Sequence, residues 1–294
     1  MDLFIPTCAR DLPQVRLLLR SLDTFVDRRA VTSLTLACID RPEIFADVRG
    51  LATHKFQACT DYLRPADLGL RETAGGGAQG WKLQQAAKLA FAARARTEYF
   101  MVLDSKNIAL RPMGAIDLVD RGKAPWVLEP VRHHPDWWRG SVWALDHAGF
   151  DRSPERLAIS SATPVIFHAP TALAMVAWLE RRHRESLQRF FERRRLIRDR
   201  FMRATEFTLY FVYLDRERLA DRYHVASDRL HDRDSQIWAS SSPALRAERL
   251  RRILSGGSQG LFTGITYAAW EALPESGRAA LQALASGASP AAAH

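Results

Sequence analysis

The residue of this 294-residue chain with the clearest chemical use is Asp104, which directly follows an apolar run. The string YFMVL over residues 99–103 predicts a buried strand, and Asp104 begins the loop after it. A buried strand that ends in a carboxylate can present an oxygen ligand to a metal–phosphate complex. A divalent cation held there would stabilise the charge that develops when a sugar–diphosphate bond breaks. The alternative is that Asp104 only caps the turn.

Two residues of the same loop modify this prediction. Lys106 stands two positions after Asp104, where a second acid would strengthen a metal site. Either Asp104 holds Mn²⁺ or Mg²⁺ with help from Asn107, a water or the diphosphate, or Lys106 acts as a fixed cation beside the phosphates. Metal dependence is therefore open from the sequence.

A helix predicted over residues 80–95 precedes this strand and carries polar side chains. Gln84 and Lys88 are four residues apart and share one face, as do Trp81 and Gln85. Amide and ammonium groups near a strand end suit phosphate or sugar hydroxyls, which favours Gln85 and Lys88 as binding residues. A solvated helix face is the alternative.

An acidic residue, Glu206, opens an apolar helix predicted over residues 205–214, with Thr205 as a cap. A carboxylate in this place could accept the proton of an attacking hydroxyl group. A glutamate in a first helical turn is also favoured by the helix macrodipole alone, so both interpretations stand.

The elements that must position these residues alternate between strands and helices in the first half of the chain. That order implies a mostly parallel sheet with helices on both faces, and such sheets bind ligands beyond the carboxyl ends of their strands. Asp40 and Asp104 both stand at such ends. Further strands are predicted at 3–6, 33–39 and 164–168, helices at 11–25, 170–183, 243–254 and 274–284, and a strand-like piece at 260–267.

Four stretches of the chain together resemble the GT-A glycosyltransferases, and most closely a bacterial group of uncharacterised proteins, the DUF6492 domain family. In order they are IPTCARDL, GWKLQQAAKL, LDSKN and TEFTLYFVY, and they span roughly residues 3–214. The resemblance implies an α/β fold that is GT-A-like (Rossmann-like), with a mostly parallel central sheet flanked by helices and a helical C-terminal part. We expect a single domain over residues 1–286 and a disordered tail over 287–294.

The resemblance also implies a function and roles for particular residues. The expected activity is transfer of a sugar from a nucleotide-sugar, a UDP-sugar before others, to a glycan or lipid-linked glycan acceptor. Asp104 would hold the diphosphate through a metal, His231 would complete the metal or diphosphate site, and Glu206 would be the acceptor base. If configuration is retained, Glu206 would bind hydroxyl groups instead. The nucleotide would contact the loop after the first strand and the end of the second, through Thr7, Arg10, Asp11 and Asp40. Asp11 could equally be only a helix cap.

The bulk composition narrows the partners. The formal net charge is +9, which favours anionic ligands. Three cysteines without a CxxC pair indicate reduced thiols and a cytoplasmic protein. The arginine-dense stretch 181–203 predicts helix and could contact the inner face of a membrane or nucleic acid. Acids interrupt this stretch as in an ordinary solvated helix, which makes nucleic acid the less favoured partner.

Two further features could contribute to the site. The Gly-rich loop 75–77 suits a mobile lid, and Trp137, Trp138 and Trp143 could form an acceptor surface, with core packing equally open for Trp143. The competing functions are a non-catalytic nucleotide- or glycan-binding protein on a degenerate GT-A fold, and a nucleic-acid-binding α/β protein.

Overall fold

The first apolar run forms the central strand of the main sheet. In the computed structural model β1 (Asp2–Thr7) lies between β2 (Ser33–Cys38) and β4 (Tyr99–Val102) and is parallel to both. β3 (Thr60–Leu63) continues the parallel pairing beyond β2, and β9 (Val165–His168) runs antiparallel to β4. The predicted α/β class with a mostly parallel sheet is therefore confirmed.

The structure describes residues 1–39, 55–72, 78–193 and 203–288, and across them the order of the main sheet is β3-β2-β1-β4-β9. From β1 the chain moves outward to β2 and β3, and later returns to place β4 on the other side of β1. The carboxyl ends of β1 and β4 thus meet where the winding direction reverses, which is where open α/β sheets bind ligands.

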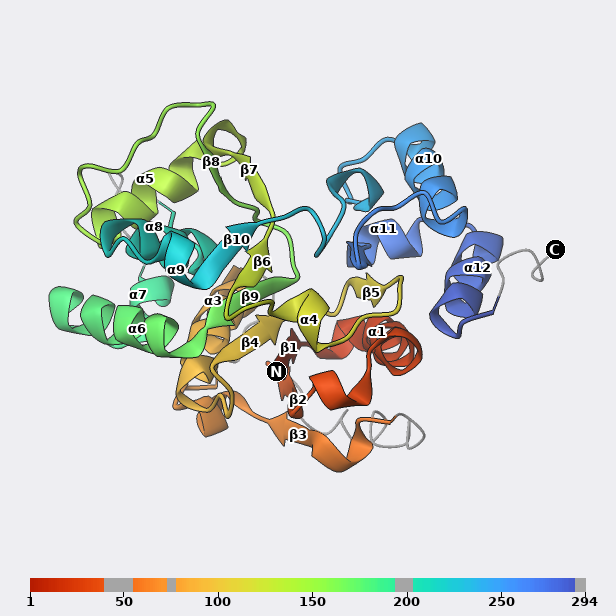
Figure 1. The fold of residues 1–294 in the computed structure, drawn as a ribbon, viewed down its shortest axis with the longest axis horizontal. Coiled ribbons are helices and arrows are strands. Elements are labelled where there is room, and N and C mark those ends of the chain that lie inside the picture. Colours follow the sequence, from red (N-terminus) through yellow and green to blue (C-terminus); the bar gives the residue numbers. More distant parts are fainter. Residues whose placement is uncertain (40–54, 73–77, 194–202, 289–294) are drawn as a thin grey trace.

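The helices and the smaller sheets surround this frame (Figure 1). The helices are α1 (Leu12–Phe25), α3 (Ala78–Ala90), α4 (Ala115–Leu118), α5 (Pro135–Ala144), α6 (Ala169–His183), α7 (Leu187–Glu192), α8 (Glu206–Arg216), α9 (Ala220–Tyr223), α10 (Pro243–Leu254), α11 (Tyr267–Glu271) and α12 (Glu275–Ala285). The short strands pair in twos: β5 (Asn107–Ala109) with β11 (Phe262–Gly264), β6 (Ala124–Trp126) with β10 (His224–Ala226), and β7 (Leu128–Pro130) with β8 (Leu157–Ile159).

Alternation along β1 fixes which helices cover which face of the sheet. Leu3 and Ile5 are buried in one apolar cluster with the inner face of α1, whereas Phe4 is buried in another with residues of α3, α6 and α8. A third cluster, which includes Ile237, Trp270 and Leu281, joins the C-terminal helices. Figure 1 shows α10, α11 and α12 gathered at one end of the molecule, away from α6 and α7, and confirms the helical C-terminal part.

The helix predicted over residues 181–203 is confirmed only in part, because within the described residues 181–183 and 187–192 are helical and the chain between them is not. α6 ends at His183, and Arg184 has a left-handed backbone with φ 54°. The short α7 buries Phe190 and Phe191 in the core beside α3, so these aromatic side chains are not available to insert into a membrane. Residues 194–202 lie outside the described part. Among the described helices, none is both long enough and apolar enough to cross a bilayer.

The single domain over residues 1–286 and the tail over 287–294 stay predictions. The strand-like piece predicted over 260–267 is shorter in the structure, because only Phe262–Gly264 pairs as β11 and Tyr267 already begins α11.

A glycine in α5 is expected to be essential for the packing of the chain that leads into α8. A Cβ atom on Gly140 would lie 2.5 Å from the backbone carbonyl carbon of Arg203. Gly140→Ala should therefore lower the free energy of unfolding by about 1–3 kcal/mol in urea denaturation. The matched control is Gly149→Ala, where the nearest atom to a Cβ would be 3.8 Å away. Equal stability of the two variants would contradict this packing.

Stability should rise with pH across the acidic range because of a buried histidine. His224 stacks on Trp126 at 4.5 Å between ring centroids, and its Nε2 lies 2.9 Å from the hydroxyl of Tyr210. Burial, helped by His168, lowers the pKa of His224 to about 3. In the unfolded chain this imidazole is protonated below about pH 6.5, whereas in the folded chain it stays neutral down to about pH 3. The free energy of unfolding therefore decreases as the pH falls through this window.

The measurement is the free energy of unfolding at several pH values between 4 and 6.5. His224→Phe should reduce its slope by up to about 1.4 kcal/mol per pH unit. An unchanged slope would show that His224 does not titrate as its burial requires.

Candidate active site

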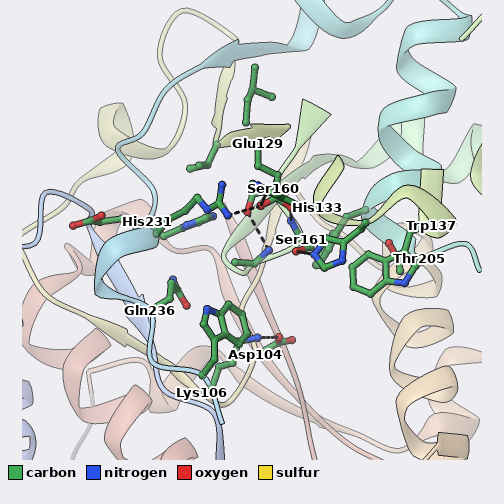
Figure 2. A pocket seen from close by; sticks show the side chains of 18 of the residues that line it. Asp104, Lys106, Glu129, His133, Trp137, Ser160, Ser161, Thr205, His231 and Gln236 are labelled. Atoms are coloured by element: carbon green, nitrogen blue, oxygen red, sulfur yellow. Dashed lines mark hydrogen bonds and ion pairs between the residues drawn. The ribbon is translucent and has the colours of Figure 1, made fainter. Parts of the chain in front are cut away.

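The carboxyl end of β4 borders a cavity of about 940 Å³, a volume in the range of small-molecule sites (Figure 2). Asp104 and Lys106 line it from the loop after β4, Gln85 and Lys88 from α3, and Glu206 from the start of α8. Residues that the sequence separates by more than one hundred positions thus meet at one place.

Two lysines and two carboxylates form a continuous chain of ion pairs in this cavity. Lys88 Nζ lies 2.9 Å from Asp104 Oδ1 and 2.8 Å from Glu206 Oε1. Lys106 Nζ lies 3.0 Å from the other oxygen, Asp104 Oδ2. Both oxygens of Asp104 are therefore bound to ammonium groups, whereas Glu206 Oε2 is buried and has no hydrogen-bond partner among the residues that the structure describes.

The ion pairs control the charges of these groups. Burial works against the charge of Lys88 and of Asp104 and is the largest single effect on each. Ion pairs with Asp104 and Glu206 together nevertheless raise the pKa of Lys88, and the ion pair with Lys88 helps to lower the pKa of Asp104. Lys106 lowers the pKa of Asp104 further. For Glu206 the balance is reversed, because burial raises its pKa more than Lys88 lowers it. A carboxylate with a raised pKa is a better proton acceptor than an exposed one.

A tight turn brings Lys106 back to Asp104. The backbone N–H of Asn107 donates to Asp104 O at 2.9 Å, and Asn107 Oδ1 accepts from Asp104 N at 2.8 Å. Ile265 N donates to Lys106 O at 2.9 Å and ties the turn to the C-terminal part. Asn107 is fully buried, with its Nδ2 donating to Thr163 O, so its amide already has partners within the fold. Its predicted part in donor binding stays a prediction.

The position of Glu206 is set by two other residues. Thr205 caps α8, its Oγ1 accepting from Thr208 N and its N–H donating to Thr208 Oγ1. Gln85 Oε1 accepts from Glu206 N at 3.1 Å, which leaves the carboxylate directed to Lys88. Thr205 as a cap is confirmed, and Gln85 contacts the backbone of the predicted base.

The late segment that carries His231 reaches the cavity through strand pairing. β11 pairs with β5, which starts directly after Lys106, and His231 bridges to Phe262 of β11. His231 and Gln236 line the cavity and are buried (Figure 2), and in the described part of the chain neither the imidazole nor the amide has a side-chain hydrogen-bond partner. Burial, with help from Lys106, lowers the pKa of His231 to about 4, so the ring is neutral. Such buried polar groups need a ligand or water.

The wall of the cavity formed by β7, β8 and α5 contains polar residues for which no role was predicted from sequence. His134 stacks on Trp137 at 3.9 Å between centroids, and its Nε2 lies 3.0 Å from Ser161 Oγ. Glu129 accepts from Ser161 N, and its other oxygen lies 3.6 Å from His133 Nδ1. The HHP string before Trp137 was the available signal, but only the fold shows that its two histidines line the same cavity as Asp104.

Of the residues predicted to contact the nucleotide from the loop after β1, Thr7, Arg10 and Asp11 are not part of the cavity lining. Thr7 is buried at the end of β1, and Arg10 is exposed beside the ring of Tyr267. Asp11 stands at the N-cap of α1 without a capping bond and instead accepts from Ser105 Oγ at 2.9 Å. Its contact joins the loops after β1 and β4. Asp40 and the loop 75–77 lie outside the described residues.

The three tryptophans predicted as an acceptor surface separate in the structure. Trp137 lines the cavity, as does the exposed Trp81 of α3. Trp138 is buried in the core, and Trp143 is exposed outside the cavity lining, near His183.

The residues around Asp104 do not fit the divalent metal that the resemblance implies. Oxygen ligands at 2.0–2.6 Å are needed, and both oxygens of Asp104 already bind ammonium groups. A doubly charged ion about 4 Å from an ammonium is repelled by roughly 8 kcal/mol at an effective dielectric constant of about 20. Over the described ranges, no group of three His, Cys, Asp or Glu side chains is arranged to hold a metal.

Comparison with known proteins gives a family match. The model of DUF6492, described as a family of unknown function, matches residues 1–266. No curated protein matches the chain.

Solved structures similar to this chain include mouse xyloside xylosyltransferase 1 in its apo form, at 12% identity, covering 78% of this chain and 86% of that one, with a TM-score of 0.45. The galactosyltransferase LgtC in complex with donor and acceptor sugar analogs is 10% identical. The match covers 98% of this chain and 96% of LgtC, with a TM-score of 0.49. An active-site mutant of LgtC is 8% identical, and the match covers 90% of this chain and 87% of the mutant, with a TM-score of 0.49.

Proposed function

The chain belongs to the DUF6492 family, and from this premise we propose that it is a glycosyltransferase with a nucleotide-sugar donor. The observation that carries the proposal is the arrangement at the end of β4. There, Asp104 forms ion pairs with both Lys88 and Lys106, and these three side chains share one cavity with the buried carboxylate of Glu206. Cations suit a diphosphate leaving group, and a carboxylate with an unpartnered oxygen suits a proton acceptor. The resemblance of four sequence stretches to GT-A glycosyltransferases gives the same reaction class.

In an inverting transfer, Glu206 Oε2 accepts the proton of the acceptor hydroxyl group. The acceptor oxygen forms a bond to the anomeric carbon as the bond from that carbon to the diphosphate oxygen breaks. The diphosphate leaves with the electron pair of the broken bond. Lys88 keeps Glu206 and Asp104 in place through its two ion pairs. If the transfer retains configuration, Glu206 binds hydroxyl groups of the donor or acceptor instead.

The nucleotide, with UDP as the first expectation, would extend from the cavity towards the loop after β1. Asp11 and Ser105 are joined at 2.9 Å, so that loop and the Asp104 turn form a continuous border. Thr7, Arg10 and Asp11 remain the candidates for the base and ribose on this side.

The acceptor side of the cavity would be the aromatic wall. Trp81 and the stacked pair of Trp137 and His134 line it, and indole faces pack well on the apolar faces of sugars. This supports a glycan as the acceptor. A lipid-linked acceptor, a cytoplasmic location and peripheral contact with the inner membrane face stay predictions.

A donor screen tests the proposal. The full chain is incubated with UDP-, GDP- and ADP-sugars and a panel of oligosaccharides, and both nucleoside diphosphate release and acceptor mass are followed. We expect one donor to release its diphosphate while an acceptor gains one glycosyl unit. A rise in melting temperature with a nucleotide-sugar but no release would instead support the non-catalytic binding protein. Neither effect, in folded protein, would contradict both functions.

A further inference from the structure

The positive charge at the end of β4 comes from Lys88 and Lys106, and the positions of these two ammonium groups indicate how a donor diphosphate would be bound. Resting on the proposed function, we propose that Lys106 binds the donor diphosphate in place of a divalent cation, so that transfer needs no metal. Asp104 then acts as a positioning residue for two ammonium groups rather than as a metal ligand.

The first support is the state of Asp104. Its Oδ1 binds Lys88 and its Oδ2 binds Lys106, at 2.9 and 3.0 Å. A metal at Asp104 would have to displace both ammonium groups; Lys88 would keep its ion pair with Glu206, whereas Lys106 has no second ion-pair partner among the described residues. The turn that follows β4 favours the pairing with lysine, because the hydrogen bonds between Asn107 and the backbone of Asp104 hold Lys106 beside Asp104.

The second support is the difference between the two lysines. Lys88 is enclosed by Asp104 and Glu206, with the ring of Phe207 at 4.9 Å, and its side chain is only 5% exposed. Lys106 has one carboxylate partner and lies 4.9 Å from the ring centroid of Trp238, with its side chain 17% exposed and lining the cavity. An ammonium has three donors, so Lys106 keeps donors for phosphate oxygens.

The third support is independent of the lysines. His231 and Gln236, on the segment that follows β10, line the same cavity, and within the described residues no side chain bonds to the buried ring nitrogens of His231 or to the amide of Gln236. A neutral imidazole and an amide can each donate one hydrogen bond to a phosphate oxygen. Figure 2 shows both residues along one side of the cavity, with Asp104 and Lys106 at its end. Together they form a donor set for a diphosphate without an added cation.

The test is the binding of UDP, GDP and ADP to the full chain by calorimetry, in EDTA and in Mn²⁺ or Mg²⁺. We expect one of them to bind wild type equally well in EDTA and in metal. Lys106→Ala should weaken that binding at least 10-fold, and the exposed Lys123→Ala, outside the cavity lining, should not. Lys106→Asp, which creates a second acid two residues after Asp104, should bind only when Mn²⁺ is present.

Each result decides a different question. Wild-type binding that requires Mn²⁺ or Mg²⁺ would overturn the lysine proposal and leave the proposed transferase intact. Equal binding by Lys106→Ala and wild type would also overturn it. Failure to bind any of the three nucleotides under any condition would count against the transferase itself. If Lys106→Ala fails to fold, Lys106→Gln and the wild-type comparison in EDTA still decide.

Discussion

Glu206→Gln should lower kcat by about 10²–10⁴-fold while the affinity for the donor nucleotide changes little. Gln has nearly the shape of Glu and its amide oxygen can still accept from Lys88, so the ion-pair chain is weakened but not removed. The amide cannot accept the acceptor proton, which is the step assigned to Glu206 Oε2. The measurement is steady-state transfer with the donor identified in the screen, together with calorimetric nucleotide binding.

The matched control is Glu217→Gln, at the opposite end of α8 and outside the cavity lining. It should leave both kcat and donor affinity unchanged. Transfer by Glu206→Gln at the wild-type rate would remove Glu206 from the role of base. In that case the next residue to test would be Glu129. It is the other buried carboxylate of the lining, and it lies beside His133.

The frame of the site could be predicted from sequence because local patterns determine it. The apolar run over 99–103 forms β4 up to Val102, and Asp104 follows at its carboxyl end as expected. The Thr205 cap and the apolar run after it fix the start of α8 at Glu206. Burial periodicity and capping act over a few residues, so a single sequence contains them.

The partners of these residues could not be predicted in the same way. Lys88 and Glu206 are 118 positions apart, and only the packing of α3 against α8 brings them within 2.8 Å. Gln236 enters the cavity because its segment runs beside β11, a three-residue strand too short to give a clear alternation. The same shortness explains why β5, β6, β7, β8 and β10 were not predicted.

The substitution Lys88→Met should have the largest effect on stability of any single change in the site. It leaves Asp104 with one cation and Glu206, 1% exposed, with none. An uncompensated buried carboxylate costs about 3–5 kcal/mol when its partner is removed, so unfolding in urea should shift by that amount and transfer should be lost. Lys82→Met in the same helix, whose Nζ contacts only a backbone oxygen of Glu192 among the described residues, should stay within about 0.5 kcal/mol of wild type.

A double substitution separates the charge effect from simple loss of packing. In Lys88→Met with Glu206→Gln, no buried charge remains at position 206, so part of the lost stability should return. Packing loss alone predicts that the two changes add and that the double variant is no more stable than Lys88→Met. Lowering the pH towards 5 should also narrow the gap between Lys88→Met and wild type. Burial raises the pKa of Glu206 even beside Lys88, and without the lysine its carboxyl is protonated more readily. A gap that is constant with pH, together with additive substitutions, would show that Lys88 stabilises the fold by its volume and not by its charge.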